Sequence, residues 1–318
     1  MSTQTVFRWT SRNGFDGLQA FPEPIPSADK HEVLVKIRSV ALNYRDIAIA
    51  TSAYPLPVKD RVVPCSDMAG EVVQVGPDVS GFSVGDAVLV APTMSQIYGS
   101  VKAGDTANTF GGSKDGVLRE YITLPAHVVI KLPKSTHNFA EWASLVGTGS
   151  TAWNAFYGST PLKPGETVLM LGTGGVSLTA LVLAKAAGAT TIITSSSDEK
   201  LEFVKSKYGA EYTINYKTYP NWAAEVQRIT NGQGVDHVIE NGGVGTIEQS
   251  LGAVAYGGTV HVIGFLTGVE QDKMPNVTML ALLKAAIVRG ILGGSKQQLE
   301  EAVRQDIFLQ PRRYSREL

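Results

Sequence analysis

The fold is decided by one stretch of the chain. It reads Thr167-Val-Leu-Met-Leu-Gly-Thr-Gly-Gly-Val-Ser177, then an apolar run to Gly188, then Thr190-Thr-Ile-Ile-Thr-Ser195. This order predicts a strand, a glycine turn, a helix and a second strand. A glycine cluster alone fits any tight turn. Here it directly follows an apolar strand and opens a helix, which is the context of a dinucleotide-binding turn.

The glycines have different tasks in such a turn. Gly172 permits the sharp reversal, and Gly174 allows backbone to approach a pyrophosphate. The start of the helix offers free N–H groups and a partial positive charge to an anion. Ser177 stands at the third glycine position, where its small side chain still lets helix and strand pack closely.

The end of the second strand indicates the type of cofactor. A site for NAD places a carboxylate there to hold the ribose 2′-hydroxyl. This chain has Thr194 to Ser197 instead, with Lys200 one helical turn further on. Hydroxyls and a cation suit a 2′-phosphate, so NADP(H) is predicted in preference to NAD(H). The serines also fit a helix cap, since Ser196 and Glu199 have the spacing of a capping box.

Composition excludes several classes of protein. The 318 residues suggest two domains, and 43% hydrophobic with 18% charged residues suits a soluble protein with a substantial core. A net charge of −1 gives no reason to expect nucleic acid or an anionic membrane as partner. The single cysteine, Cys65, excludes an internal disulfide and a thiolate zinc cluster. With no apolar segment of spanning length and no signal-peptide core, a cytoplasmic location is expected.

The chain is expected to form two domains of an α/β protein. Clustered valines between Gly, Pro and Asp turns predict a compact β domain over 1–125, and 93–116 is expected to be a loop or lid. Alternating strand and helix patterns predict a doubly wound parallel sheet over 126–295. A helix over 139–158 bridges the halves, and residues 296–318 are expected to return toward the first domain.

Several motifs together resemble the medium-chain dehydrogenase/reductase superfamily, nearest its zinc-free quinone and enone reductase branch. The resemblance implies a GroES-like catalytic domain followed by a Rossmann domain, and it covers about residues 5–305. The motifs that carry it are Asn43-Tyr-Arg-Asp46, Gly70-Glu-Val-Val-Gln-Val-Gly76, Val84-Gly-Asp-Ala-Val88, Leu162-Lys-Pro-Gly-Glu-Thr-Val-Leu169, Gly172 to Ser177, Gly209-Ala210 with Ile214-Asn-Tyr216, and Gly257-Gly258.

The resemblance argues against zinc. Asn43 stands where zinc-dependent members have their first cysteine ligand, and Ser66 where they have a histidine. Amide and hydroxyl groups are poor zinc ligands. Without a Lewis acid, electron-poor acceptors are favoured: quinones, or C=C bonds conjugated to a carbonyl. The expected function is therefore NADPH-dependent hydride transfer to such an acceptor.

The resemblance also implies candidate site residues. Tyr44 and Arg45, with Asn43 beside them, are candidates to stabilise charge on the substrate carbonyl oxygen. A structural Arg45–Asp46 ion pair, a packed Tyr44 ring and a proton supplied by water remain alternatives. The implied cofactor contacts are Thr151, Gly172, Gly174, Gly175, Val176, Ser195, Ser196, Lys200, Tyr216, Asn241, Ile263 and Phe265. Tyr216 and Phe265 equally fit aromatic packing, and His237 and His261 fit buried sheet positions.

Two alternatives to this function remain open. One is an alcohol dehydrogenase-like enzyme. The other is a nucleotide-binding protein with little catalysis, because the polar, basic segment after residue 305 lacks the strand alternation that relatives have there. A small-molecule substrate is expected. A homodimer is also expected, because in the family the strand near Ala286–Leu292 often pairs across a dimer.

Overall fold

The computed structural model describes residues 2–268 and 274–304, which divide into two compact units. Within them, the first unit holds residues 2–150 and 294–304, and the second holds 151–268 and 274–293. The boundary follows Ser150 rather than Pro125, because β7 (Val129–Lys131) pairs antiparallel with β5 (Ala87–Val90) inside the first unit. Helix α2 (Phe139–Tyr157) crosses this boundary.

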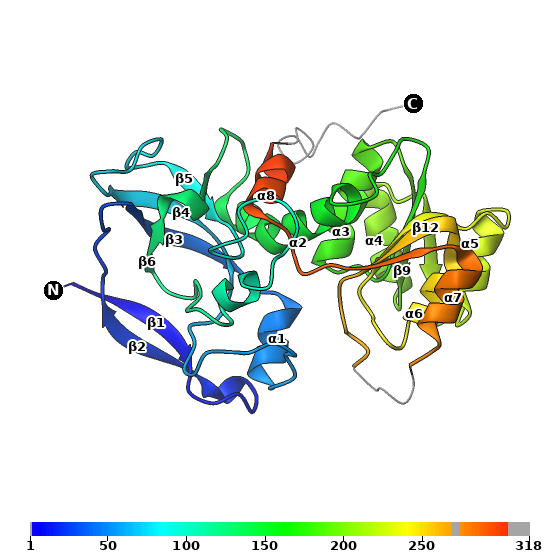
Figure 1. The fold of residues 1–318 in the computed structure, drawn as a ribbon, viewed down its shortest axis with the longest axis horizontal. Coiled ribbons are helices and arrows are strands. Elements are labelled where there is room, and N and C mark those ends of the chain that lie inside the picture. Colours follow the sequence, from blue (N-terminus) through cyan, green and yellow to red (C-terminus); the bar gives the residue numbers. More distant parts are fainter. Residues whose placement is uncertain (1, 269–273, 305–318) are drawn as a thin grey trace. The chain divides into compact units, whose positions relative to one another are not determined.

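The first unit is built on a five-stranded antiparallel sheet in the order β6-β3-β4-β5-β7 (Figure 1). A separate hairpin, β1-β2, precedes it in the chain. The remaining elements of this unit are β1 (Thr3–Trp9), η1 (Phe15–Gly17), β2 (Leu18–Pro24), β3 (Glu32–Ala41), α1 (Tyr44–Ala50), β4 (Asp67–Val75), η2 (Asp105–Asn108), β6 (Tyr121–Pro125), η3 (Ala126–Val128) and α8 (Lys296–Val303).

The clustered valines of the predicted β domain supply the core of this sheet. Val33 and Val35 of β3 are fully buried and pack with Val72 of β4 in one apolar cluster. Leu299 and Val303 of α8 join a second cluster in the same unit, so the described part of the C-terminal segment does pack with the first unit. Residues 305–318, whose altered pattern raised the question of reduced activity, lie outside the described residues.

The expected loop at 93–116 carries internal structure. A β-bridge joins Thr93 to Thr109, and the Asp105 carboxylate accepts hydrogen bonds from the Ser95 hydroxyl and the Lys102 N–H, each at 2.7 Å. The Gln96 carbonyl accepts the N–H of Lys296 at 2.9 Å. These contacts tie the loop to the start of α8.

The second unit is a six-stranded parallel sheet in the order β10-β9-β8-β11-β12-β13. Numbered along the chain, this is the order 3-2-1-4-5-6 of a Rossmann fold. Its elements are β8 (Thr167–Met170), α3 (Gly175–Ala186), β9 (Thr190–Ser195), α4 (Asp198–Tyr208), β10 (Tyr212–Asn215), α5 (Trp222–Ile229), β11 (Val235–Glu240), α6 (Ile247–Ala253), β12 (Val254–Val262), α7 (Val277–Lys284) and β13 (Ile287–Gly290).

Apolar side chains on both faces of the central strands explain why helices cover them. Leu169 of β8 packs in a cluster with residues of α5, α6 and α7, while its neighbours Val168 and Met170, which point the other way, are also fully buried. Helices α3 and α4 contact β8, β9 and β10. Strands that are buried on both faces have continuous apolar sequences, and Val168-Leu-Met170 of β8 is such a sequence.

One predicted helix start is wrong by one residue. The cap of α4 is Ser197, whose Oγ accepts the N–H of Lys200 at 3.3 Å, so the Ser196–Glu199 capping box does not form. The neighbouring serine offers an equivalent cap.

The two strand histidines of the second unit form a buried pair. His237 Nδ1 lies 3.0 Å from His261 Nε2, and His237 Nε2 lies 3.2 Å from the Glu166 carboxylate. Burial lowers the pKa of both rings, and that of His261 falls to about 3. Both positions are interior sheet positions, as the sequence indicated.

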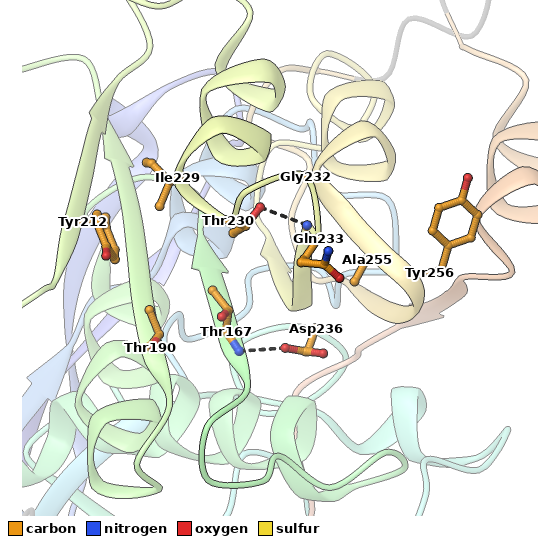
Figure 2. A pocket seen from close by; sticks show the side chains of 11 residues that line it. Thr167, Thr190, Tyr212, Ile229, Thr230, Gly232, Gln233, Asp236, Ala255 and Tyr256 are labelled. Atoms are coloured by element: carbon orange, nitrogen blue, oxygen red, sulfur yellow. Dashed lines mark hydrogen bonds between the residues drawn. The ribbon is translucent and has the colours of Figure 1, made fainter.

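An open cavity of about 650 Å³ lies at the amino ends of the second unit's strands (Figure 2). Its lining includes Thr167, Thr190 and Tyr212, each the first residue of its strand. Ligands of open α/β sheets bind at the opposite, carboxyl ends, so this cavity is distinct from the expected cofactor site. No helix among residues 2–268 and 274–304 is long and apolar enough to cross a membrane.

Candidate functional site

The glycine turn after β8 has the geometry that an approaching anion requires. Gly172 has φ +76°, a left-handed conformation that disfavours side chains. Gly174 is the N-cap of α3, with φ −81° and ψ 174°. A Cβ placed on either residue would meet no atom within 4 Å, so both glycines face open space. The first N–H groups of α3 have no partner within the helix and are available at this end.

Hydrogen bonds join β8 and β11 where the strand order of the sheet reverses. The Asn241 side-chain amide, directly after β11, donates to Ser177 Oγ at 3.0 Å and to the Leu171 carbonyl at 3.3 Å. The Ser177 hydroxyl donates to the same carbonyl at 2.8 Å. Serine at the third glycine position therefore fixes the turn as well as leaving room. Rossmann folds bind dinucleotides at this reversal.

The predicted 2′-phosphate residues lie around the carboxyl ends of β9 and β10. Ser195 is only 4% exposed, and its carbonyl accepts the N–H of Tyr216 at 3.0 Å. Ser196 is half-buried and Lys200 is exposed, while Tyr216 is 41% exposed. Of this group, the Ser195 side chain is the least accessible to a ligand. The phosphate-binding role of all four residues stays a prediction.

The remaining predicted cofactor residues also belong to the second unit. Asn241 and the pair Ile263 and Phe265 follow β11 and β12, so they lie at the carboxyl edge of the sheet. Thr151 lies in α2, is buried, and is the first residue of this unit. The predicted cofactor residues thus all belong to one unit, and most lie at one edge of its sheet.

The predicted catalytic residues lie together at the start of α1 in the first unit. Asn43 is the N-cap, and its backbone N–H donates to Asp46 Oδ2 at 2.8 Å. Tyr44, the first residue of the helix, is 44% exposed. The carboxylate of Asp46 at the third helical position suits the positive end of the helix dipole.

Asp67 is a buried carboxylate held from two directions. Its Oδ1 accepts the Ser66 hydroxyl at 2.5 Å, and its Oδ2 accepts the N–H of Gly147 at 2.6 Å. Burial raises the pKa of Asp67, against the lowering effect of hydrogen bonds from Ser66 and Asn43. Burial also raises the pKa of Asp46. The two acids are therefore engaged by this unit's own donors.

The Arg45 guanidinium is turned into the first unit. Its carbon Cζ lies 5.4 Å from the centre of the Tyr54 ring, and a Cβ on Gly112 would come within 2.8 Å of its Nη2. Its Nε and Nη2 are buried and make no hydrogen bond within the described residues. Among the ion pairs recorded for these residues, none joins Arg45 to Asp46, although the Arg45 charge lowers the pKa of that acid.

Cys65 lies beside these acids in a strained conformation, with φ +67°. The backbone around it is tight, because a Cβ on Gly111 or Gly116 would approach Cys65 atoms within 2.6 Å or 2.0 Å. Burial raises the pKa of its thiol, and the charges of Asp46 and Asp67 raise it further. In this surrounding the neutral thiol is favoured over the thiolate.

Comparison with known proteins identifies the family. A model of the alcohol dehydrogenase GroES-like domain matches residues 29–134, and a model named zinc-binding dehydrogenase matches residues 175–306. A zinc-type alcohol dehydrogenase-like protein of Schizosaccharomyces pombe is 43% identical over 92% of this chain and 85% of its own length. The chain belongs to the medium-chain dehydrogenase/reductase superfamily.

Other members of the superfamily with different activities are also similar to this chain. Human quinone oxidoreductase is 28% identical over 80% of this chain and 70% of its own length. The structure of a candidate alcohol dehydrogenase from Sinorhizobium meliloti has a TM-score of 0.86 at 36% identity, covering 95% of this chain and 88% of that one. Membership of this superfamily establishes that the protein is an oxidoreductase with a GroES-like and a Rossmann domain, and that its fold binds a nicotinamide cofactor.

The residues fit the nicotinamide cofactor of the superfamily but fit zinc poorly. The open glycine turn and the Asn241–Ser177 contact stand where a dinucleotide binds. Asn43 and Ser66 occupy two positions at which zinc-dependent members are expected to have ligands. The described residues also include no group of three His, Cys, Asp or Glu suited to a metal. The zinc-binding dehydrogenase model matches from residue 175 onward, outside this cluster.

Sequence reasoning missed one residue of the site, Glu240. This carboxylate ends β11, is fully buried and is hydrogen bonded to the loop that follows. The signal was present, because an acid ends the strand Val235–Glu240 after the apolar pair Val238-Ile239, directly before an Asn-Gly-Gly sequence. A carboxylate that is fully buried requires partners.

The turn can be tested separately from the stability of the fold. Gly174 has a conformation open to any residue and free space at its Cβ, so Gly174→Ala is expected to leave the Tm within about 2 °C. The methyl group would occupy the space that a pyrophosphate needs, so the Kd for NADPH is expected to rise about tenfold or more. Thermal unfolding and fluorescence titration measure the two effects.

Gly104→Ala is the matched control, because this glycine also has space at its Cβ and an ordinary backbone conformation, but lies in the first unit. Unchanged NADPH affinity in Gly174→Ala would contradict the assignment of the turn.

Proposed function

We propose that this protein is an NADP(H)-preferring, zinc-independent reductase that transfers hydride to a quinone or to a C=C bond conjugated to a carbonyl. The observation that carries the proposal is the cluster around α1. Asn43 and Ser66 replace expected metal ligands, and Asp67 is held by Ser66 and Gly147. Such a site offers hydrogen-bond donors in place of a Lewis acid, so it suits acceptors that are already electron-poor.

When bound, the nicotinamide supplies the hydride. The residues of this chain bind and orient the cofactor and stabilise the charge that develops on the substrate. In the second unit, the turn at Gly172 and Gly174 and the start of α3 would hold the pyrophosphate. In the first unit, the hydroxyl of Tyr44, a residue that is 44% exposed, would donate a hydrogen bond to the substrate oxygen.

We assign Arg45 a supporting part in this proposal. Burial raises the pKa of Asp46 and Asp67, and the positive charge of Arg45 opposes that rise. Its guanidinium packs against Tyr54. Arg45 directly follows Tyr44 in α1. Its positive charge would stabilise the negative charge of an enolate bound near Tyr44. Asn43 caps the helix that presents Tyr44 and would set its position.

The alternative, an alcohol dehydrogenase-like reaction, is favoured by the 43% identical relative, whose name carries that activity. Oxidation of an unactivated alcohol without a metal requires a general base within reach of the hydroxyl. Asp46 and Asp67 are the acids that Asn43, the residue before Tyr44, contacts, but both are buried. The reductase therefore remains the proposal that these side chains support better.

The cofactor preference is tested by Lys200→Ala. The loss of an exposed cation near the 2′-phosphate is expected to raise the Kd for NADPH about fivefold to tenfold and to leave the Kd for NADH unchanged. Titration of nicotinamide fluorescence measures both constants. Lys205→Ala, on the same helix and also exposed, is the control. Wild-type protein that binds NADH as tightly as NADPH would contradict the preference.

The role of Tyr44 is tested by Tyr44→Phe. Loss of a hydrogen bond that strengthens in the transition state is expected to lower kcat about tenfold to a hundredfold while the Kd for NADPH stays constant. Steady-state kinetics with an enone and with a quinone measure kcat. Tyr98→Phe, on an exposed loop residue, is the control. A kcat equal to that of the wild type would mean that Tyr44 takes no part and that water supplies the proton.

We also propose a homodimer that forms through β13. This strand ends the six-stranded sheet, and its Ile287 and Val288 are 43% and 37% exposed. Neighbouring α7 exposes Leu282 and Leu283 at 72% and 63%. An edge strand beside apolar side chains favours pairing with a second copy.

Val288→Lys is expected to convert such a dimer into a monomer of 33.9 kDa, as measured by sedimentation equilibrium. The charge would oppose pairing of the two edges. Val101→Lys, at an exposed apolar position in the first unit, is the control. A wild-type protein that sediments as a monomer at micromolar concentration would overturn the dimer.

A further inference from the structure

The carboxylate of Glu240 collects four hydrogen bonds at the end of β11. Its Oε1 accepts from the N–H of Gly242 at 2.7 Å, the N–H of Gly243 at 3.0 Å and the Thr246 hydroxyl at 2.6 Å. Its Oε2 accepts from the Ser250 hydroxyl. Glu240 is 0% exposed, so these donors replace water completely. One side chain thus fixes the loop after β11 and the start of α6.

The backbone of Glu240 fixes a second loop. Its carbonyl accepts the N–H of Ile263 at 2.8 Å and that of Gly264 at 3.2 Å, directly after β12. The two loops are joined again further out, where the Thr267 hydroxyl donates to the Gly242 carbonyl at 2.8 Å. A Cβ on Gly264 would come within 2.2 Å of the Asn241 carbonyl, so the loops are also in close contact.

These two loops carry three of the predicted cofactor residues: Asn241, Ile263 and Phe265. They leave adjacent strands at the carboxyl edge of the sheet, beside the point where the strand order reverses. The adenine end is expected elsewhere, at the ends of β9 and β10. The loops bound to Glu240 are therefore suited to the nicotinamide end.

We propose that Glu240 is a positioning residue for the nicotinamide half of the cofactor. Its carboxylate holds the loop after β11 in the one conformation that lets Asn241 and Phe265 flank the ring. The inference rests on the proposed function, because it requires a nicotinamide dinucleotide in the second unit. Glu240 acts through the loops and does not itself touch the cofactor.

The chemistry of the site explains why a carboxylate is needed. All four groups around Glu240 are donors, and only a carboxylate offers acceptors at both oxygens. In Glu240→Gln the amide oxygen can keep the Oε1 bonds while the NH2 group faces Ser250, whose hydroxyl can rotate to accept from it. The negative charge that strengthens all four bonds is lost, so the loop after β11 is held less tightly.

The experiment compares the two halves of the cofactor. In Glu240→Gln, the Kd for NADPH is expected to rise about tenfold and the shift of nicotinamide fluorescence on binding to be reduced. The Kd values for 2′,5′-ADP and for 5′-AMP, which carry only the adenine half, are expected to stay within about twofold. Thr246→Val removes a single donor to Oε1 and is expected to give a smaller change of the same kind.

Glu166→Gln is the control, since this acid binds His237 at the amino end of the same sheet. It is expected to leave all three affinities unchanged. A purely structural role of Glu240 would weaken the binding of the adenine-half nucleotides and NADPH equally, and that result would overturn the inference. The inference would also be overturned if both Glu240→Gln and Thr246→Val bound NADPH with the affinity and the fluorescence of the wild type.

The outcomes separate this inference from the proposed function. Wild-type protein that binds neither NADPH nor NADH would overturn both. If the wild-type protein binds NADPH and reduces an enone, and Glu240→Gln and Thr246→Val have the same NADPH affinity and fluorescence, only the positioning role would be overturned. If Glu240→Gln does not fold, the NADPH affinity and fluorescence of Thr246→Val alone test the positioning role.

Discussion

The second unit depends on the parallel pairing of β8 with β11, because the strand order of the sheet reverses there. Helices connect the strands outward in both directions from this pair, so the loops at its carboxyl end diverge and leave space for a ligand. Asn241 and Ser177 join the two loops across the pair, and Gly174 leaves room beside them. The same pairing therefore organises the sheet and the cofactor turn.

The first unit meets a different constraint, the burial of two acids near the start of α1. Asp46 is bound by the N–H of Asn43, and Asp67 by Ser66 and Gly147. These bonds offset part of the lost hydration and hold a set of polar groups in position, while burial still raises the pKa of both acids. Asn43 and Ser66, which stand where the family resemblance expects metal ligands, take part in these bonds.

Local patterns predicted most of the elements, and long-range contacts account for what they missed. Strand β9 has the predicted bounds, Thr190–Ser195, because apolar runs and glycine punctuation are local signals. The sequence placed the domain boundary too early, because β7 has three residues and is recognisable only through its pairing with β5. Glu240 was missed for the same reason, since its importance comes from donors that folding brings together. The catalytic roles of Tyr44 and Arg45 rest on the resemblance and stay predictions.

The measurement that tests the central claim most directly is turnover after metal removal. Protein treated with a strong chelator and verified metal-free by mass spectrometry is assayed for NADPH oxidation with cyclohex-2-enone and with 1,4-benzoquinone. The account predicts that turnover persists and does not increase when zinc is added. Loss of activity on chelation, restored by zinc and accompanied by oxidation of a simple secondary alcohol, would contradict it.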